Sequence, residues 1–326
     1  MSVSLGRDLK NDPNPPDLER EEPVKAQRLE GKKPSGSRGK PLPGEDSLTP
    51  EPPESDMVDP QNLSEQGVEE LEDDEDDEII EEEVFLKAMV YGAPGVGKTT
   101  LLASGHNDPR LWPGVLLDFE GGTLSVRSRI RRVALSDFVR GVEPAPGRID
   151  VIRIESWGDF DKVTQRLWND DRYKLVAVDS LTEVNYLCQQ YVVGEARKRD
   201  RTHAEDSVEL QDYLRSSNRM RSLIRELRDM PIHTVFAAGL KEDQNPKTKR
   251  QQRRPALTGQ LGFEVVGLLS IVGLLDTYEN DQGQTARELI TYPDDSWIAK
   301  DRSEGGLLGD TLHNPTLPKI LDLLQL

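Results

Sequence analysis

The chain has very little cysteine and no long apolar run. Cys188 is the only cysteine, so an intrachain disulfide and a cysteine-based zinc site are both excluded, and a buried, inert thiol is expected. The longest weakly polar run, residues 262–275, contains Glu264 and is too short to span a bilayer. The first residues, MSVSLGRDLKNDPNPP, lack the apolar segment of a secretory signal. We therefore expect a cytoplasmic protein with no membrane partner.

Aromatic residues are absent from residues 1–83, which carry nearly all of the net charge. This segment contains 26 Asp and Glu against 9 Lys and Arg, a net charge of −17, whereas residues 84–326 contain 34 acidic and 33 basic residues. It is rich in proline and ends in EELEDDEDDEIIEEE, so it cannot bury enough apolar surface to offset the entropy cost of ordering. We expect a disordered acidic tail over 1–83. It either solubilises the protein or competes with nucleic acid for a basic site on the rest of the chain.

A phosphate-binding loop is predicted at residues 92–99, GAPGVGKT, which match G-x-x-x-x-G-K-[ST] at every fixed position. Glycines let the backbone turn so that successive N–H groups point at phosphate oxygens beside the start of a helix. Lys98 is expected to act as a catalytic residue on the β and γ phosphates of ATP, and the Thr99 hydroxyl to bind Mg2+. VFLKAMVY before the loop predicts a strand, and TTLLAS after it predicts a short helix. The predicted nucleotide-binding residues are Gly92, Ala93, Pro94, Gly95, Val96, Gly97, Lys98, Thr99 and Thr100.

Apolar strand patterns alternate with helical patterns across residues 84–326, a length that suits one α/β domain. Uninterrupted apolar strands between helices predict a mainly parallel sheet with helices on both faces. The expected strands are 84–91, 115–118, 150–154, 175–179, 233–238, 268–275 and 288–292. The expected long helices are 159–168, 181–198 and 210–230.

Two acidic residues that follow predicted strands bear on what happens to the nucleotide. Asp179 ends the apolar strand in YKLVAVDS, where ligands of parallel sheets gather, and we expect its carboxylate to hold Mg2+. The alternative role for Asp179 is to cap the next helix. Glu120 follows the strand in LLDFEGGT, and we expect it to orient and deprotonate the attacking water rather than to be a solvated turn carboxylate. Glu183 in DSLTE is a competing base because it lies just beyond Asp179.

The order YGAPGVGKTT, LLDFEGGT, LVAVDSLTEV resembles the ATPase core of RecA-type recombinases, particularly the compact RecA-like ATPases of bacteriophages that act in single-strand annealing. The resemblance covers residues 84–326 and implies a RecA-like P-loop NTPase fold. It places Glu120 at the position of the catalytic base and Asp179 at the magnesium-associated strand end. The later segments AKDR and NPTL also resemble the phage-type family.

The resemblance also bears on residues late in the chain. RecA-type cores use basic residues there to reach the ATP of a neighbouring subunit, which makes Lys300 and Arg302 candidates for this role. A surface ion pair with Asp301 or Glu304 is the alternative. One departure concerns the strand that senses the γ-phosphate, which usually ends in a polar residue, whereas TVFAAGLKED has alanine and glycine before Lys241. Either Lys241 substitutes or the coupling of ATP to DNA differs.

A basic segment, KTKRQQRRP, follows that strand and lacks strand or helix periodicity. RecA-type proteins place a DNA-binding loop at this position. Its cations would give salt-sensitive and largely sequence-independent binding, and the lack of aromatic residues favours backbone contacts over base stacking. A solvated basic loop is the alternative, and the runs RKRDR (197–201) and RSRIRR (127–132) are interpreted first as solvated helix ends. The DNA-binding candidates are Lys247, Lys249, Arg250, Arg253 and Arg254.

These features together predict a DNA-stimulated ATPase that converts ATP and water to ADP and phosphate. We expect it to act on single-stranded DNA in recombination, annealing or repair and to be encoded by a phage. Assembly into a ring or filament, and contact with single-strand-binding or other replication proteins, are implied by the resemblance. An AAA-type motor or assembly ATPase is one alternative. A nucleotide-dependent switch that binds a protein partner with little turnover is another. A GTPase is disfavoured because the sequence has no N-K-x-D segment.

Overall fold

Helices and strands alternate along the described part of the chain, which in this computed structural model comprises residues 83–200, 208–244 and 249–326. The strands are β1 (Lys87–Gly92), β2 (Gly114–Asp118), β3 (Ile130–Arg132), β4 (Ile149–Arg153), β5 (Leu175–Asp179), β6 (His233–Gln244), β7 (Gln251–Pro255), β8 (Ile271–Glu279), β9 (Thr285–Ile290), β10 (Lys300–Asp301) and β11 (Thr311–His313). The α-helices are α1 (Lys98–Leu102), α2 (Leu135–Val139), α3 (Trp157–Trp168), α4 (Leu181–Arg199), α5 (Leu210–Asp229), α6 (Leu261–Leu268) and α7 (Leu317–Leu324).

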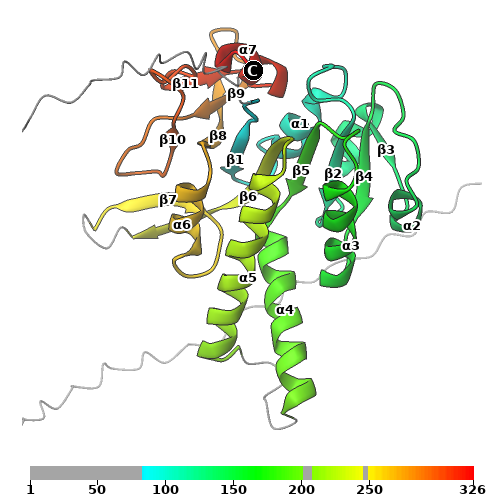
Figure 1. The fold of residues 1–326 in the computed structure, drawn as a ribbon. Coiled ribbons are helices and arrows are strands. Elements are labelled where there is room, and N and C mark those ends of the chain that lie inside the picture. Colours follow the sequence, from blue (N-terminus) through cyan, green and yellow to red (C-terminus); the bar gives the residue numbers. More distant parts are fainter. Residues whose placement is uncertain (1–82, 201–207, 245–248) are drawn as a thin grey trace, which may run out of the picture. The chain divides into compact units, whose positions relative to one another are not determined.

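The strands form one sheet in the order β11-β9-β8-β1-β6-β5-β2-β4-β3, with β10 paired to β8 and β7 paired to β6 (Figure 1). From β8 to β3 every neighbouring pair on this path is parallel, whereas β7, β9, β10 and β11 run antiparallel to their partners. The predicted α/β fold with a mainly parallel sheet flanked by helices is confirmed. The predicted acidic tail lies, except for Glu83, outside the described residues.

Successive side chains of each strand point to opposite sides of the sheet. Both sides are apolar here, and helices cover each of them. Tyr91 and Val178 belong to a core cluster that includes α3, α4, α5 and α6. Their neighbours Val90 and Ala177 belong to a second cluster that includes α1 and α7. Parallel strands buried on both faces are continuously apolar, which explains why the sequence showed apolar runs rather than alternation.

The long helices begin and end close to the predicted positions. Ser156 caps α3, since its hydroxyl accepts a hydrogen bond from the backbone N–H of Asp159 at 3.1 Å. Thr316 caps α7 in the same way through Lys319 at 3.2 Å. Helices α4 and α5 pack side by side and project beyond the edge of the sheet (Figure 1). None of the helices in the described ranges is long and apolar enough to cross a membrane.

Two segments differ from the prediction. Strand β6 continues to Gln244 and pairs with β7, so the second half of the basic segment is a strand in a hairpin rather than an irregular loop. The apolar run at 262–275, from which a strand at 268–275 was predicted, contains α6 and then β8 from Ile271. A short apolar run has no periodicity that separates a buried helix from a buried strand. Here α6 buries Leu261, Gly262 and Val265, and β8 is buried over residues 271–275.

Candidate nucleotide-binding site

The phosphate loop connects β1 to α1 at the carboxyl edge of the parallel strands. Gly95 and Gly97 have φ angles of 82° and 105°, a left-handed conformation that glycine adopts without strain. Gly92 is required for a different reason, since a Cβ there would lie 2.3 Å from the backbone oxygen of Leu275. The sequence pattern therefore describes backbone geometry that other residues cannot supply.

Lys98 lies along the loop that precedes it. Its Nζ donates hydrogen bonds to the carbonyl oxygens of Gly92 at 3.0 Å and Ala93 at 3.1 Å. Burial lowers the pKa of Lys98, while the nearby carboxylates of Glu120 and Asp179 act in the opposite direction. An ammonium group held over the loop by backbone carbonyls is in a position to exchange these partners for phosphate oxygens.

Asp179 and Thr99 form the next part of the site. The Thr99 hydroxyl donates a hydrogen bond of 2.6 Å to Oδ2 of Asp179, whose side chain is almost fully buried. Burial raises the pKa of Asp179 to about 6. Its other oxygen, Oδ1, is buried without a hydrogen-bond partner among the described residues. A buried carboxylate oxygen without a donor, beside a hydroxyl, fits a cation.

The ligand set at this position fits Mg2+ in particular. The described residues contain no group of three or more His, Cys, Asp or Glu side chains that could hold a metal by themselves. Mg2+ is typically held by one or two protein oxygens, with water and phosphate oxygens completing its shell. Thr99 and Asp179 are therefore the residues that would hold it, and the ion would supply positive charge to the β and γ phosphates.

Glu120 lies next to Asp179 because β2 and β5 are paired in register, with Asp118 opposite Asp179. The Ser180 hydroxyl donates a hydrogen bond of 2.5 Å to Oε1 of Glu120. Glu183, the competing base, is exposed in the first turn of α4 and makes no side-chain hydrogen bond within the described ranges. Of the two glutamates, the geometry favours Glu120.

The turn that carries Glu120 is held by Asp118, which the sequence did not single out. Oδ1 of Asp118 accepts hydrogen bonds from the backbone N–H groups of Glu120 at 3.1 Å and Gly121 at 2.6 Å. Arg153 approaches the same oxygen at 3.5 Å. The aspartate before a glycine-containing turn was a signal for this bracing, since such side chains commonly bond the backbone two or three residues on.

A cleft of about 200 Å³ lies beside the loop, on the side of α1. Arg287 of β9 reaches across it, and its Nε donates a hydrogen bond of 2.8 Å to the carbonyl oxygen of Val96. Arg287 could not be selected from the sequence, because it lies 191 positions after Val96 and only the sheet brings it to the loop. The cleft is lined by Gly97, Thr100, Leu101, Ser104, Arg129, Leu275, Arg287, Asn314, Pro315 and Thr316.

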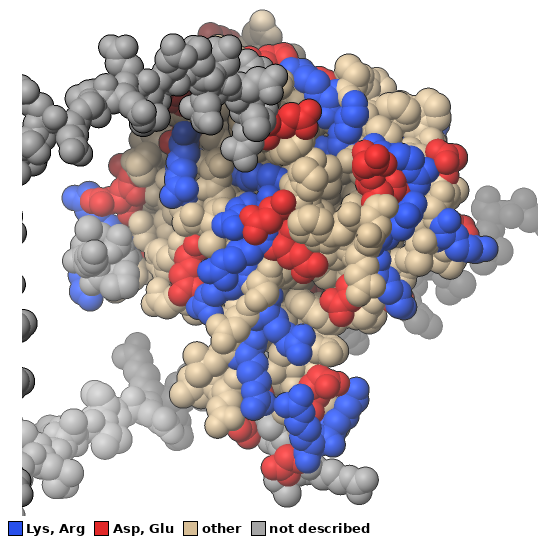
Figure 2. All heavy atoms as spheres, viewed as in Figure 1, with Lys and Arg blue, Asp and Glu red and all other residues tan. Residues whose placement is uncertain are grey.

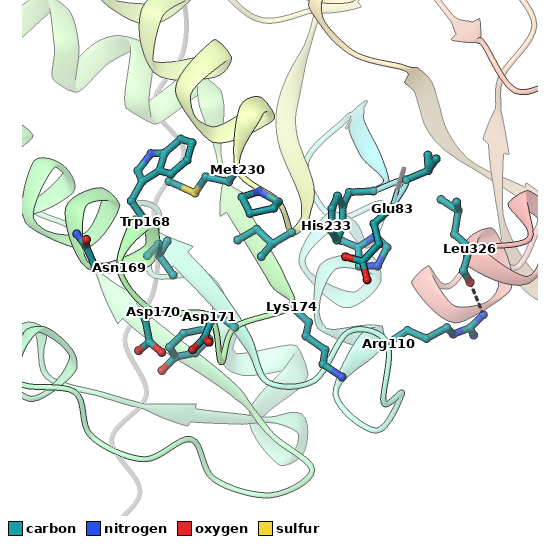
Figure 3. A pocket seen from close by; sticks show the side chains of 16 residues that line it. Glu83, Arg110, Trp168, Asn169, Asp170, Asp171, Lys174, Met230, His233 and Leu326 are labelled. Atoms are coloured by element: carbon teal, nitrogen blue, oxygen red, sulfur yellow. Dashed lines mark hydrogen bonds between the residues drawn. The ribbon is translucent and has the colours of Figure 1, made fainter. Parts of the chain in front are cut away.

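A cavity of about 970 Å³, larger than the cleft beside the loop, has no residue of the phosphate loop in its lining. Trp168, Met230 and His233 lie along one side of it, and Lys174 and Arg110 along another (Figure 3). It lies at the amino ends of β5 and β6, since Lys174 and His233 stand at the starts of these strands. Ligands of parallel sheets bind at the carboxyl ends, so this cavity is not the nucleotide site.

The predicted DNA-binding residues have different surroundings. Lys247 lies outside the described residues, and Lys249 and Arg250 are exposed before β7. Arg253 forms ion pairs with Glu242 and Asp276.

The prediction that Arg254 binds DNA is wrong. This arginine is only 4% exposed, its guanidinium contacts the Asp243 carboxylate and the Leu257 carbonyl, and it lies over the ring of Phe263. These contacts make Arg254 part of the packing of the hairpin, and a buried, fully engaged guanidinium does not reach an outside phosphate.

The prediction that Lys300 reaches the ATP of a neighbouring subunit is also wrong. The Nζ of Lys300 donates hydrogen bonds of 2.6 Å to the carbonyl oxygens of Val266 and Leu269 at the end of α6, and burial lowers the pKa of Lys300. It therefore stabilises a helix terminus of its own chain rather than extending to a neighbour. Arg302 is exposed. Lys241 pairs with Asp243 at 3.3 Å on the hairpin.

The run 127–132 is divided among three roles. Arg131 forms an ion pair with the buried Asp150 at 2.7 Å, and Arg132 donates to the Thr123 hydroxyl at 2.8 Å. Arg129 lines the cleft beside the loop. The arginines of this run therefore do not form one continuous basic surface.

The loop, the buried aspartate and the adjacent glutamate at one edge of a parallel sheet define a nucleotide-binding P-loop ATPase domain. Residues 85–303 match the family model described as "AAA domain", so the chain belongs to this AAA domain family. No curated protein matches the chain. Among solved structures, the crystal structure of the RadB recombinase is similar, with 19% identity and a TM-score of 0.37 over 63% of this chain and 81% of that one. At that TM-score the similarity supports no conclusion about activity.

Proposed function

We propose that this protein is a RecA-like ATPase that hydrolyses ATP to ADP and phosphate and acts on single-stranded DNA in recombination, annealing or repair. The observation that carries the ATPase part is the junction of Thr99, Asp179 and Glu120 at the carboxyl edge of the sheet. The DNA part is supported by the exposed cations Lys249 and Arg250 at the β6–β7 hairpin and by the RecA-type motif order. A phage origin, assembly into a ring or filament and contact with replication proteins belong to the same proposal.

In this mechanism the backbone N–H groups of the loop bind the β and γ phosphates, and Lys98 neutralises the charge that develops on the γ-phosphoryl group. Thr99 and Asp179 would hold Mg2+. Glu120 orients a water molecule and accepts its proton as the water oxygen bonds to the γ-phosphorus and the bond to the bridging oxygen of ADP breaks. The cleft with Arg129 and Arg287 would receive the ribose and base.

Lys98→Ala tests the catalytic assignment. Turnover of ATP should be abolished, because the loop then lacks the cation that reaches the β and γ phosphates. The matched control is Lys162→Ala, which removes an exposed lysine that pairs with Asp159 alone in the part of the chain the structure describes, and it should leave turnover unchanged. Undiminished activity of Lys98→Ala would remove Lys98 from the mechanism. Turnover of the wild type with single-stranded DNA, with duplex DNA and without DNA tests the DNA part, and stimulation by single strands is expected.

A motor or assembly ATPase acting on protein or duplex DNA is the second candidate, and the AAA description of the matched family favours it. Such enzymes commonly follow the core with a helical lid. After β6 the described residues contain five further strands and the helices α6 and α7, which is less helical than a lid requires. Stimulation by duplex DNA or by a protein, without stimulation by single strands, would favour this candidate.

A further inference from the structure

A small pocket lies at the carboxyl edge of the sheet, beside the turn that carries Glu120. Strands β2, β4 and β3 lie side by side in that order (Figure 1), and the pocket is found where they end. Its volume is about 250 Å³. Within the described ranges it shares no lining residue with the cleft beside the phosphate loop, so it is a separate site. It is lined by Asp118, Gly121, Arg132, Val133, Val151 and Arg153.

The two arginines of the pocket are placed by the register of the strands. Arg153 stands opposite Asp118 in the β2–β4 pair, and Arg132 stands opposite Val151 in the β3–β4 pair. Side chains at paired positions leave the same face of a sheet, as do residues two apart along one strand, so both arginine side chains leave one face. The backbone N–H of Ile154 donates to the carbonyl oxygen of Asp118 at 3.0 Å, which holds the end of β4 against β2.

Both guanidinium groups keep donors that their own chain does not use. Arg132 donates to the Thr123 hydroxyl through one nitrogen, at 2.8 Å. Arg153 approaches Oδ1 of Asp118 at 3.5 Å, and its side chain donates no hydrogen bond to the part of the chain that the structure describes. Both side chains are exposed, Arg153 by 47%. Since a guanidinium carries five N–H donors, most of those in the pocket are available to a ligand.

The pocket contains more positive than negative charge. Of the described residues that line it, Asp118 is the one carboxylate, and its Oδ1 already accepts two backbone N–H groups. Glu120 accepts from Ser180 on the side of β5, and β5 and β4 lie on opposite sides of β2. Glu155 comes two residues after Arg153 but does not line the pocket. By contrast, over much of the face shown in Figure 2 the Lys and Arg side chains lie next to Asp and Glu side chains.

We propose that this pocket binds inorganic phosphate, the product of ATP hydrolysis, and the proposal rests on the proposed function. Guanidinium groups match the oxygens of a phosphate ion with paired N–H donors. A water molecule occupies about 30 Å³ in the liquid, so a pocket of this volume holds a phosphate ion together with several waters. Its described lining contains no aromatic ring on which a nucleotide base could stack, which favours the bare ion.

The position of the pocket connects phosphate to turnover. A Cβ built on Gly121, the residue after Glu120, would lie 3.5 Å from a terminal nitrogen of Arg153. An anion bound by Arg153 therefore lies against the turn that carries the catalytic base, and it competes with Asp118 for the same guanidinium. Asp118 holds the backbone N–H groups of Glu120 and Gly121. Phosphate in the pocket should thus disturb Glu120 and slow turnover without displacing ATP.

Equilibrium dialysis of radiolabelled phosphate against the full-length protein tests the site directly. Saturating AMP-PNP, an ATP analogue that is not hydrolysed, is added with Mg2+ so that the phosphate loop is occupied, and the wild type should still bind phosphate. Arg132→Ala leaves Arg153 and Asp118 in place and should weaken this binding by about tenfold or more, the usual effect of hydrogen bonds to charged groups. Arg132→Lys keeps the charge and should weaken it less. The matched control Arg140→Ala removes an exposed arginine that pairs with Asp137 and should not change it.

Steady-state turnover with added phosphate tests the link to catalysis. Phosphate in the pocket should lower kcat and leave KM for ATP unchanged, whereas phosphate in the loop would compete with ATP and raise KM. In Arg132→Ala the same loss of kcat should require about tenfold more phosphate.

The outcomes separate the pocket from the proposed function. If AMP-PNP abolishes phosphate binding to the wild type, phosphate binds in the loop alone, and the pocket proposal is wrong while the proposed function stands. Equal phosphate affinity of the wild type and Arg132→Ala would also refute the pocket. If the wild type binds phosphate beside AMP-PNP through Arg132 but does not turn over ATP, the pocket is supported and the proposed hydrolysis fails.

Discussion

At the scale of single residues, the groups of the nucleotide site hold one another in place. Lys98 donates to carbonyl oxygens of its own loop, Thr99 to Asp179, and Ser180 to Glu120. Each of these contacts uses an atom that ATP, Mg2+ or water would contact during the reaction. Hydrogen bonds therefore hold these side chains in place before a ligand binds, and the ligand would replace their partners. This limits the reorganisation that binding requires.

Glu120→Gln should reduce turnover by about 100-fold or more while ATP binding changes little. The amide keeps the size and the hydrogen bond to Ser180 but cannot accept a proton from water, and general base catalysis contributes about 10² to 10⁴ in rate. Steady-state turnover and the binding of a fluorescent ATP analogue measure the two effects. Glu183→Gln serves as the control and should leave turnover intact. A larger loss in Glu183→Gln than in Glu120→Gln would transfer the role of base to Glu183.

Arg287→Ala should weaken nucleotide binding more than it slows chemistry. The side chain holds the Val96 carbonyl at 2.8 Å and lines the cleft beside the loop, and hydrogen bonds from charged groups contribute about 1.5 to 3 kcal/mol. We expect KM for ATP to rise by about tenfold with a smaller change in kcat. Arg132→Ala is the control, because among the described residues this arginine bonds Thr123 alone. An unchanged KM in Arg287→Ala would show that the cleft does not receive the nucleotide.

The contrast between Lys98 and Arg287 shows what part of the site sequence can predict. The residues of the loop are consecutive and their backbone geometry demands glycine, so the pattern alone locates them. Arg287 and Ser180 act through contacts that depend on which strands are neighbours, and composition and spacing do not give that order. Asp118 instead bonds the backbone two and three residues on, a local pattern that can be recognised in a sequence. Arg254 and Lys300 were misjudged because a cation in a basic run carries no sign of whether its own chain already supplies carbonyl or carboxylate partners.

At the scale of elements, long helices and central strands were predictable and short or edge elements were not. Helices α4 and α5 carry many turns of periodic sequence, and β5 is an uninterrupted apolar run. Strand β7 is polar and depends on pairing with β6, and β11 has only three residues. Such elements are stabilised by their neighbours, so their own sequences contain little signal.

His233, the first residue of β6, bonds the residue just before β1 and makes the stability of the fold depend on pH. Its Nδ1 accepts a hydrogen bond from the backbone N–H of Leu86 at 3.0 Å, and burial, with a smaller effect from Lys87, lowers the pKa of His233 to about 4. Below pH ~6.5 His233 becomes protonated in the unfolded chain, whereas in the folded chain it stays neutral down to pH ~4. The free energy of unfolding should therefore fall by about 3 kcal/mol over this interval from His233 alone.

Urea unfolding at several pH values between about 4 and 7 checks this expectation. His233→Asn keeps an acceptor for Leu86 but does not titrate, so its loss of stability towards acid pH should be smaller than that of the wild type. His313→Asn is the control, because His313 is exposed on β11. An equal acid loss in the wild type and in His233→Asn would show that His233 is not the group responsible.

At the scale of the whole molecule, the charge is divided unequally along the chain. Residues 84–326 are close to neutral, with 34 acidic and 33 basic side chains, whereas residues 1–83 carry −17. From the sequence we expect a polyanion that binds the exposed cations Lys249 and Arg250 to compete with this anionic segment of the same chain. Such competition acts over about 10 Å at 0.1 M salt and weakens as salt rises.

Deletion of residues 1–82 should consequently raise the affinity for oligo(dT) by several-fold at low salt, and the difference should vanish at high salt. The matched control deletes residues 1–68 and keeps the acidic run at 69–83, so it should behave as the full chain does if that run is the competitor. Fluorescence anisotropy titrations at a series of salt concentrations measure both. An unchanged affinity at low salt after deletion would refute the competition and leave solubility as the role of the tail.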